Sequence, residues 1–220
     1  YAGYELETAG VLKGGRKFWA LARSGLGTAL KGQDQVNDYL LLATSCDGSL
    51  ATVAMPTSVR VVCNNTLSIA VDGMSQGVKV PHSTEFRPQL VKQQLGISVS
   101  QWDDFMYRLK TLAERKVSQE EARAYFQAVI CNAEAPLEDP SKLPNVRALN
   151  RVQKLYQGEG RGSRLCTAQG TAWGLLNAVT EYVDHEKRAR SSDYRMDSAW
   201  FGQGAGLKDK ALESALALVA

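Results

Sequence analysis

The sequence lacks long apolar runs, close cysteine pairs and a visible secretory signal. No run approaches the ~20 apolar residues that a membrane-spanning helix needs. The four cysteines, Cys46, Cys63, Cys131 and Cys166, include no Cys-x-x-Cys pair, the spacing by which zinc sites usually present two thiolates. The chain opens on Tyr1 rather than Met, which leaves room for a segment before it. We therefore expect a cytoplasmic protein with reduced cysteines, no membrane partner and no bound metal.

The sequence also lacks the usual motifs for nucleotide or metal chemistry. The stretch "GEGRGSR" from Gly158 to Arg164 is rich in glycine, but it has no lysine where a Walker phosphate loop requires one. Ser163 stands where a dinucleotide fingerprint needs its third glycine. The chain has two histidines and no His-Glu-x-x-His motif. We therefore expect no cofactor and no nucleotide hydrolysis.

What is present at the start of the chain is typical of β-hairpins. Gly14 and Gly15, after Lys13, predict the tight turn of a first hairpin, and "DG" at 47–48 predicts the turn of a second one. Pro56 is expected to end the strand that follows, or to start a bulge. The stretch "NNTLSIAV" is expected to turn helical, with the first or second asparagine as its cap, and "GVKVPHS" to form a short strand.

From residue 84 onward the apolar residues recur with a helical period. Ser100 and Ser118 are expected N-caps, and Glu121 completes a capping box with Ser118. The prolines of "EAPLEDPSKLPN" predict a loop over 134–145. Helices are expected in "FRPQLVKQQLGI", "SQWDDFMYRLKTLAERKV" and "SQEEARAYFQAVICNA", and over 146–157, 171–188 and 207–219.

Strands first and helices after predict an α+β fold rather than an alternating α/β fold. We expect a single domain over residues 1–220. Its N-terminal antiparallel β-hairpins, over 1–83, form a sheet that packs against a mostly helical C-terminal half over 84–220.

Two groups of basic residues are candidate DNA contacts, and Lys187, Arg188 and Arg190 form a further cluster after the helix expected over 171–188. On an ideal helix at ~100° per residue, three cations from 147 to 154 share a narrow arc, opposite apolar residues, and two arginines follow in the glycine-rich stretch. Such clusters suit a polyanion, because each neutralised phosphate releases counterions. The hairpin set consists of Lys13, Arg16, Lys17, Trp19 and Arg23, and the helix-and-loop set consists of Arg147, Arg151, Lys154, Arg161 and Arg164.

Each of these clusters has an ordinary structural explanation as well. A solvated helix face explains the cations of the helix-and-loop set without any ligand. Phe18 or Trp19, interleaved with the hairpin cations, can stack on an unpaired base. One face of a strand must also be buried, and a buried Phe18 or Trp19 satisfies that requirement equally well.

One group of residues suggests enzyme chemistry. Glu181 and His185 lie four residues apart on an expected helix, with Asp184 beside them, so they can share a divalent metal or act as an acid–base pair. His82 in "VPHS" can complete such a site. A polar helix face with His185 near its C-terminal end needs no chemistry at all. We therefore favour a protein without enzyme activity and keep the enzyme as an open alternative.

Five stretches resemble one family in order along the chain: "ETAGVLKGGRKFWALARSG", "PTSVRVVCNNTLSIA", "VKVPHS", "GTAWGLLNAVTEYVDH" and "SAWFGQGAGLKDKALE". They are similar to phage- and plasmid-like proteins that are classed together as a domain of unknown function. The resemblance implies a setting in phages, plasmids and integrated elements, and it carries over no catalytic residue.

Hairpins before helices, a basic surface and that setting are similar to the single-strand annealing recombinases of the Rad fifty-two, Erf and Redβ types. The resemblance is one of architecture and setting. It implies a homo-oligomer, a ring or a filament, that holds single-stranded DNA in a basic groove.

We therefore expect an ATP-independent protein of phage or plasmid origin that binds single-stranded DNA and promotes DNA annealing and recombination. The hairpin set and the helix-and-loop set are the expected DNA contacts. Two alternatives stay open. One is a metal-dependent enzyme acting on nucleic acid or nucleotide, centred on Glu181 and His185. The other is a phage or plasmid interaction protein that acts on host defence through its helical half.

Overall fold

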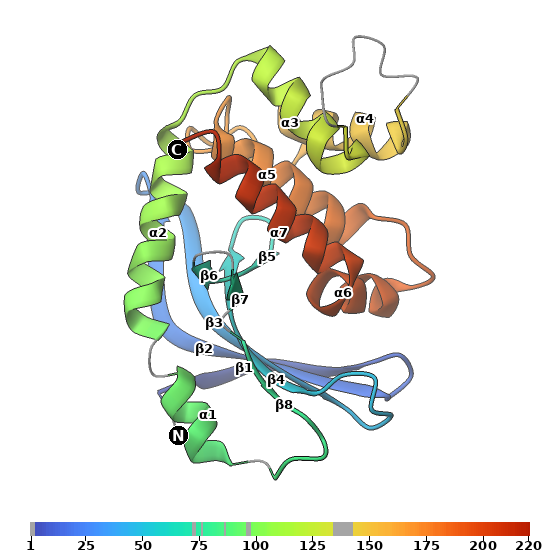
Figure 1. Cartoon of the computed structure of the whole chain (residues 1–220). Coiled ribbons are helices and arrows are strands. Elements are labelled where there is room, and N and C mark those ends of the chain that lie inside the picture. The colour runs from blue at the N-terminus through green and yellow to red at the C-terminus, as the bar shows by residue number, and fades with distance from the viewer. Residues whose placement is uncertain (1–2, 72–73, 76, 86, 96–97, 134–142) are drawn as a thin grey trace. The chain divides into compact units, whose positions relative to one another are not determined.

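A computed structural model describes the chain of 220 residues except residues 1–2, 72–73, 76, 86, 96–97 and 134–142 (Figure 1). It divides into two compact units, and the expected single domain stays a prediction. The sheet unit comprises Tyr1–Thr28, Val36–Arg60 and Thr66–Tyr107, and the helical unit comprises Ala29–Gln35, Val61–Asn65 and Arg108–Ala220. The predicted α+β class is confirmed, because an antiparallel sheet precedes a helical C-terminal half.

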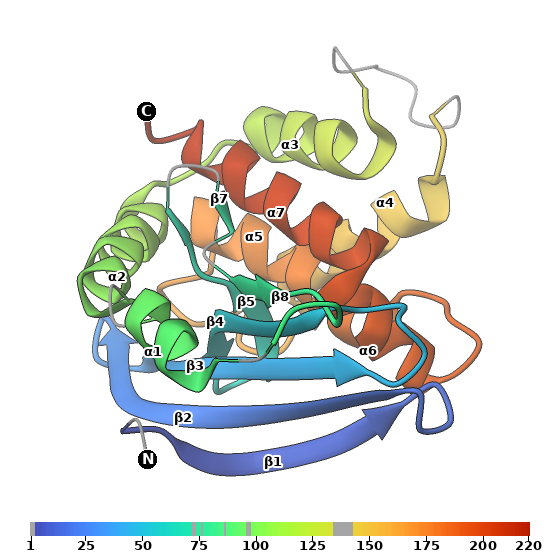
Figure 2. The same ribbon diagram turned by 60° about the horizontal axis from the view of Figure 1, so that its bottom comes forward.

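Among the described residues, six strands form one sheet in the order β1-β2-β3-β4-β5, with β8 also paired to β4. Figure 2 shows the long strands β1, β2 and β3 side by side. Two short strands, β6 (Ala70–Val71) and β7 (Met74–Ser75), pair with each other. The strands of the main sheet are β1 (Glu5–Leu12), β2 (Lys17–Leu30), β3 (Asp34–Ser45), β4 (Thr52–Arg60), β5 (Asn65–Ser68) and β8 (Val78–Val80).

Both hairpins predicted from glycine-containing turns are confirmed. Lys13, Gly14 and Gly15 have φ angles of 53°, 66° and 90° and join β1 to its antiparallel partner β2. Gly48, at φ 71°, lies in the turn between β3 and β4. A positive φ costs glycine little, so these residues set where each hairpin turns. The short strand expected in "GVKVPHS" is also confirmed, as β8.

Two expectations about the strands were wrong. β4 runs through Pro56, which pairs with Leu40 on one side while its carbonyl accepts a hydrogen bond from the amide of Ile69 at 3.0 Å. A proline is tolerated there because it lacks only the N–H donor of the backbone, so its carbonyl can still accept a hydrogen bond. The stretch expected to turn helical instead forms β5, which pairs with β4, and β6, which pairs with β7, so strand pairing overrides the local preference. Asn64 adopts a φ of 54°, in the turn before β5.

The helices are bounded largely as the apolar periodicity predicts. One was missed, α6 (Ser192–Phe201). Two π-helical turns, η2 (Leu155–Glu159) and η3 (Tyr182–Glu186), continue α4 and α5. The remaining helices are α1 (Pro88–Leu95), α2 (Ser98–Glu114), α3 (Gln119–Cys131), α4 (Val146–Lys154), α5 (Ala172–Glu181) and α7 (Gln203–Leu216).

The local signals at helix ends gave one correct and one wrong prediction. The capping box of Ser118 and Glu121 is confirmed at the start of α3, since each side chain bonds the other residue's amide. Ser100 lies inside α2, which begins at Ser98, so the prediction of Ser100 as an N-cap was wrong. Most of the predicted loop, residues 134–142, lies outside the described residues.

α5 is the central helix of the helical unit. Every residue from Ala172 to Glu181 is buried, and α7 runs alongside it (Figure 1). The helix starts at Thr171, whose hydroxyl accepts a hydrogen bond from the amide of Gly174 at 3.1 Å. This N-cap fixes the start of α5 and thereby the depth at which its last residue, Glu181, lies.

Candidate functional site

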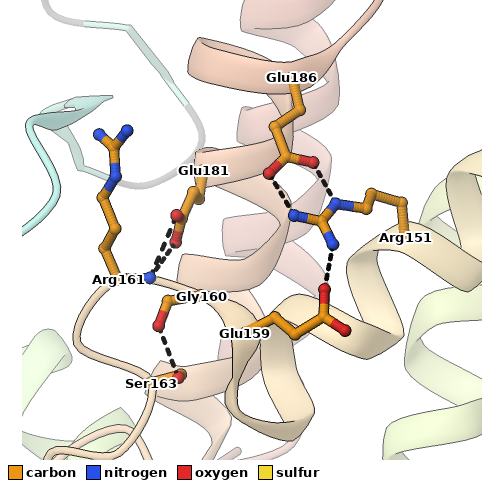
Figure 3. A network of polar contacts seen from close by, with 7 residues as sticks. All are labelled: Arg151, Glu159, Gly160, Arg161, Ser163, Glu181 and Glu186. Atoms are coloured by element: carbon orange, nitrogen blue, oxygen red, sulfur yellow. Dashed lines mark hydrogen bonds and ion pairs between the residues drawn. The ribbon is translucent and has the colours of Figure 1, made fainter.

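The glycine-rich stretch over residues 158–164, called the loop, begins in the last two residues of η2 and is held by a buried carboxylate. The amide of Arg161 donates to both oxygens of Glu181, at 3.1 and 3.0 Å (Figure 3). Glu181 is only 5% exposed. A carboxylate of the protein therefore occupies the backbone amide that a phosphate-binding loop would offer to an anion.

Glycine is required at the centre of the loop. A Cβ at Gly160 would lie 2.7 Å from the carbonyl oxygen of Leu155 and 3.0 Å from Oε2 of Glu181. The Gly160 amide donates to that same carbonyl at 3.0 Å, and Ser163 Oγ donates to the Gly160 carbonyl at 2.6 Å. The glycines thus let the backbone approach Glu181 closely, and the loop has a defined conformation.

A second anchor ties the loop to two helical elements. Arg151 on α4 donates to both carboxylate oxygens of Glu186 on η3, at 2.6 Å from Nη2 to Oε1, and it also bonds Glu159 at the end of η2 (Figure 3). The hydrogen bond from Arg151 lowers the pKa of Glu186. One guanidinium thus joins three segments of the helical unit.

The helix-and-loop set therefore contains two kinds of residue. The Arg151 guanidinium is engaged by two carboxylates, whereas the other four cations are exposed. A Cβ at Gly158 would lie 3.6 Å from Nε of Arg164, so the Arg164 side chain returns to the end of η2. The exposed members, called the exposed cations below, are Arg147, Lys154, Arg161 and Arg164.

The hairpin set divides in a similar way. Arg16 and Arg23 are exposed, whereas Lys17 is 5% exposed. Trp19 pairs with Gly10 across the hairpin, where a Cβ would lie 2.9 Å from the indole ring, so the indole covers Gly10. Lys13 lies in the turn itself and is partly buried.

Phe18 lies on the opposite face of β2 from Trp19, as strand alternation requires. It is 44% exposed, whereas Trp19 is partly buried, and both residues contribute to the lining of an apolar pocket of about 280 Å³. Phe18 is therefore the more accessible of the two aromatic residues considered for stacking.

The residues considered for an enzyme site contact different groups in the structure. Burial raises the pKa of Glu181, and the amide and charge of Arg161 and the charge of His185 oppose that rise. Asp184 instead accepts from Nζ of Lys208 at 2.8 Å, in a pair whose side chains are 7% and 4% exposed. Within the described residues, no group of three or more His, Cys, Asp or Glu side chains could hold a metal ion. His82, in the sheet unit, contacts the carbonyl of Leu50 at 2.8 Å.

Sequence reasoning missed the anchors of the loop. Glu186 is separated from Arg151 by 35 residues and Glu181 from Arg161 by 20, so no helical or strand spacing connects them. Glu159, eight residues after Arg151, gave no signal either, because the π-helical turn shifts it out of the α-helical register.

No helix in the described part of the chain is long and apolar enough to cross a membrane. Comparison with curated proteins finds no match, and comparison with solved structures finds none either. A family model described as "Domain of unknown function (DUF932)" matches residues 1–200 of the 220. The match spans most of the chain, and the protein therefore belongs to the DUF932 family.

Proposed function

We propose that the protein binds single-stranded DNA through the exposed cations and promotes the annealing of complementary strands without ATP. The observation that carries this proposal is the held loop. Glu181 fixes the backbone at Arg161, and Arg151 fixes the loop against α4 and η3. Cations on a fixed frame lose less conformational entropy when they meet a phosphate backbone than cations on a mobile loop.

The spacing of the exposed cations suits a chain of phosphates. Arg147 and Lys154 share one face of α4 and are about 10 Å apart along the axis, at ~1.5 Å per residue. Arg161 and Arg164 extend that series into the loop. Contacts of this kind depend on charge and not on sequence, which is what a protein that pairs arbitrary complementary strands requires.

In this proposal Arg151 positions the loop and does not contact phosphate, because two carboxylates already surround it. Arg16 and Arg23 of the hairpin set are additional DNA contacts, since both are exposed. The phage or plasmid origin and the homo-oligomeric state complete the proposal. They rest on the resemblance to mobile-element proteins and to annealing recombinases.

The test is a salt series of fluorescence anisotropy with a labelled ~40-nucleotide single strand and a duplex competitor. The logarithm of the binding constant falls linearly with the logarithm of the salt concentration, with a slope set by the phosphates contacted. Lys154→Ala and Arg164→Ala should each weaken binding on every sequence and reduce the slope by about one. Lys110→Ala, which removes an exposed cation of α2 outside the set, is the matched control.

Absence of binding at low salt would overturn the proposal. Slopes that stay unchanged in both variants would remove these residues from the interface. Annealing is then measured as the pairing rate of two complementary labelled strands, with and without ATP. We expect acceleration that ATP does not alter, because pairing of aligned strands is downhill and the chain lacks a Walker loop.

A further inference from the structure

Beside the loop, the helical unit contains a polar cleft of about 430 Å³ between α3 and the α4–η2 segment. This volume falls in the range of about 300–1,000 Å³ that small-molecule sites occupy. Its distinguishing feature is three side-chain amides. We call this site the glutamine cleft. Its lining includes Gln119, Arg123 and Phe126 of α3, Gln153 of α4, and Tyr156 and Gln157 of η2.

The polar groups of the glutamine cleft suit an uncharged ligand that forms hydrogen bonds. Each glutamine amide offers two donor hydrogens and an acceptor oxygen from one planar group. The charged side chains of the lining, Glu120 and Arg123, have opposite signs and lie three residues apart on α3. The cleft therefore has no net charge with which to attract a phosphate, and its donors and acceptors favour a neutral polar edge.

One wall of the cleft is aromatic. The rings of Phe126 and Tyr156 meet edge to face, with centroids 5.7 Å apart and an interplanar angle of 68°. Phe126 is 1% exposed and supports Tyr156, which is partly exposed. Burial raises the pKa of Tyr156 to about 12, so its hydroxyl remains a donor at neutral pH. An aromatic wall beside planar amides is the combination by which proteins hold unstacked nucleobases.

The cleft also lies next to the cations that the proposed function assigns to phosphate. Gln153 precedes Lys154 on α4, and Gln157 precedes the loop. On an ideal helix, consecutive residues are separated by ~100°, so the amides and the cations occupy adjacent faces of one element. A strand whose phosphates follow the cations can therefore turn a base toward the amides.

We propose that the glutamine cleft receives one unstacked base of the bound single strand and recognises its hydrogen-bonding edge. This inference rests on the proposed function, and it adds a contact to the base where that function needs contacts only to phosphate. Pairs of donor and acceptor on glutamine match the edge of adenine best, so adenine is the expected preference.

The experiment compares an oligo-dA 20-mer with a 20-mer of the same length that carries a block of abasic sites. Both strands keep their phosphates, so the ratio of their dissociation constants reports base contacts alone. The wild-type protein should bind the abasic strand at least about fivefold more weakly. Gln153→Ala and Gln157→Ala should reduce that ratio while leaving the salt slope unchanged, because neither removes a charge.

Gln169→Ala is the matched control, since it removes an exposed glutamine of the same unit outside the cleft. Gln157→Glu is a second variant of the same shape, which keeps the volume and replaces the two donor hydrogens with a charge. It should weaken dA binding more than binding of the abasic strand.

The possible failures are distinguishable. If the wild-type protein binds neither strand at low salt, the proposed function fails and this inference fails with it. If both strands bind with the expected salt slope, but the ratio is near one or does not change in the cleft variants, only the base contact is overturned. A ratio reduced equally by Gln169→Ala would also overturn it.

Discussion

Asp38, in the middle of β3, is a buried carboxyl group that costs the sheet unit stability. It is 8% exposed, and burial raises its pKa to about 6 against the opposing hydrogen bonds of Ser24 and the Tyr39 amide. A raised pKa in the folded state gives stability that is present below the ordinary value and is lost as the pH rises through about 6. We therefore expect Asp38→Asn to be more stable than the wild type at pH 8, by up to about 3 kcal/mol, with the difference shrinking toward pH 4.

The measurement is urea denaturation of the wild type and each variant at pH 3, 4, 6 and 8. Asp47, in the second hairpin turn, gives a control of opposite sign. Hydrogen bonds from Ser49 lower its pKa, so its contribution is present at neutral pH and lost in acid. Asp47→Asn should therefore be less stable than the wild type at pH 8, and the difference should shrink as the pH falls into the acid range. An Asp38→Asn advantage that grows toward acid would contradict the assignment.

Glu181 shows why a perturbed carboxyl group is not by itself a catalytic one. Its pKa is raised by burial, which is a common property of acid–base residues. Both of its oxygens, however, accept hydrogen bonds from the amide of Arg161. The free-energy cost of burying the Glu181 carboxylate is thus offset by the ordering of the loop. The group has a structural role.

The loop is the element whose conformation depends most on one residue. Gly160→Ala would place a methyl group against the Leu155 carbonyl and the Glu181 carboxylate, which must then move. We expect a loss of about 1–3 kcal/mol in the free energy of unfolding, the usual range for overpacking. Affinity for single-stranded DNA should fall as well, because Arg161 and Arg164 would leave their places.

Gly206→Ala is the matched control for this variant. Gly206 lies in α7, and no neighbouring atom lies within 4 Å of a Cβ added there. That substitution should stabilise the helix by about 0.5–1 kcal/mol and leave DNA affinity unchanged. Thermal unfolding and strand affinity are measured on both variants. Wild-type affinity in a destabilised Gly160→Ala protein would show that the loop frame does not serve binding.

At the same scale, elements with a local signal were predictable and long-range ones were not. The turn at Gly14 and Gly15 and the capping box at Ser118 depend on neighbours within a few residues, and both were predicted. Pro56 was wrongly predicted to end the strand, because β4 keeps its pairing with β3 at Leu40 while the Pro56 carbonyl still accepts a hydrogen bond from the amide of Ile69. The bond of Arg151 to Glu186 joins residues far apart in sequence, so the fold alone reveals it.

For the whole molecule, net charge says little about where a polyanion would bind. The chain has 26 basic and 23 acidic residues, a formal net charge of +3. Several basic side chains form ion pairs within the protein. Among them are Arg151, which bonds two carboxylates, and Lys208, which forms a buried pair with Asp184. What distinguishes the exposed cations is therefore their location beside a held loop. The composition indicates a weakly basic protein. The structure is needed to distinguish the basic side chains that form internal ion pairs from those that are exposed.

We expect the proposed homo-oligomer to form through the β1 edge of the main sheet, beside which the described part of the chain places no further strand. β1 is an edge strand, and its residues from Glu5 to Ala9 are exposed, including Leu6 at 65%, while Val11 near its end is 51% exposed. Long edges that expose apolar side chains tend to pair with another copy unless charges or bulges prevent it. Glu5, Glu7 and the register shift between Leu6 and Thr8 provide some of that protection.

The double variant Leu6→Lys, Val11→Lys adds two charges to this edge without touching the exposed cations of the helical unit. If self-association uses β1, light scattering after gel filtration should give an oligomeric mass for the wild type and the mass of one chain for the variant. Single-strand affinity per chain, measured below the association concentration, should stay equal or rise slightly, because the added lysines can only attract phosphate. An unchanged oligomeric mass would place the contact elsewhere, since two like charges facing their copies across paired edges would oppose that association.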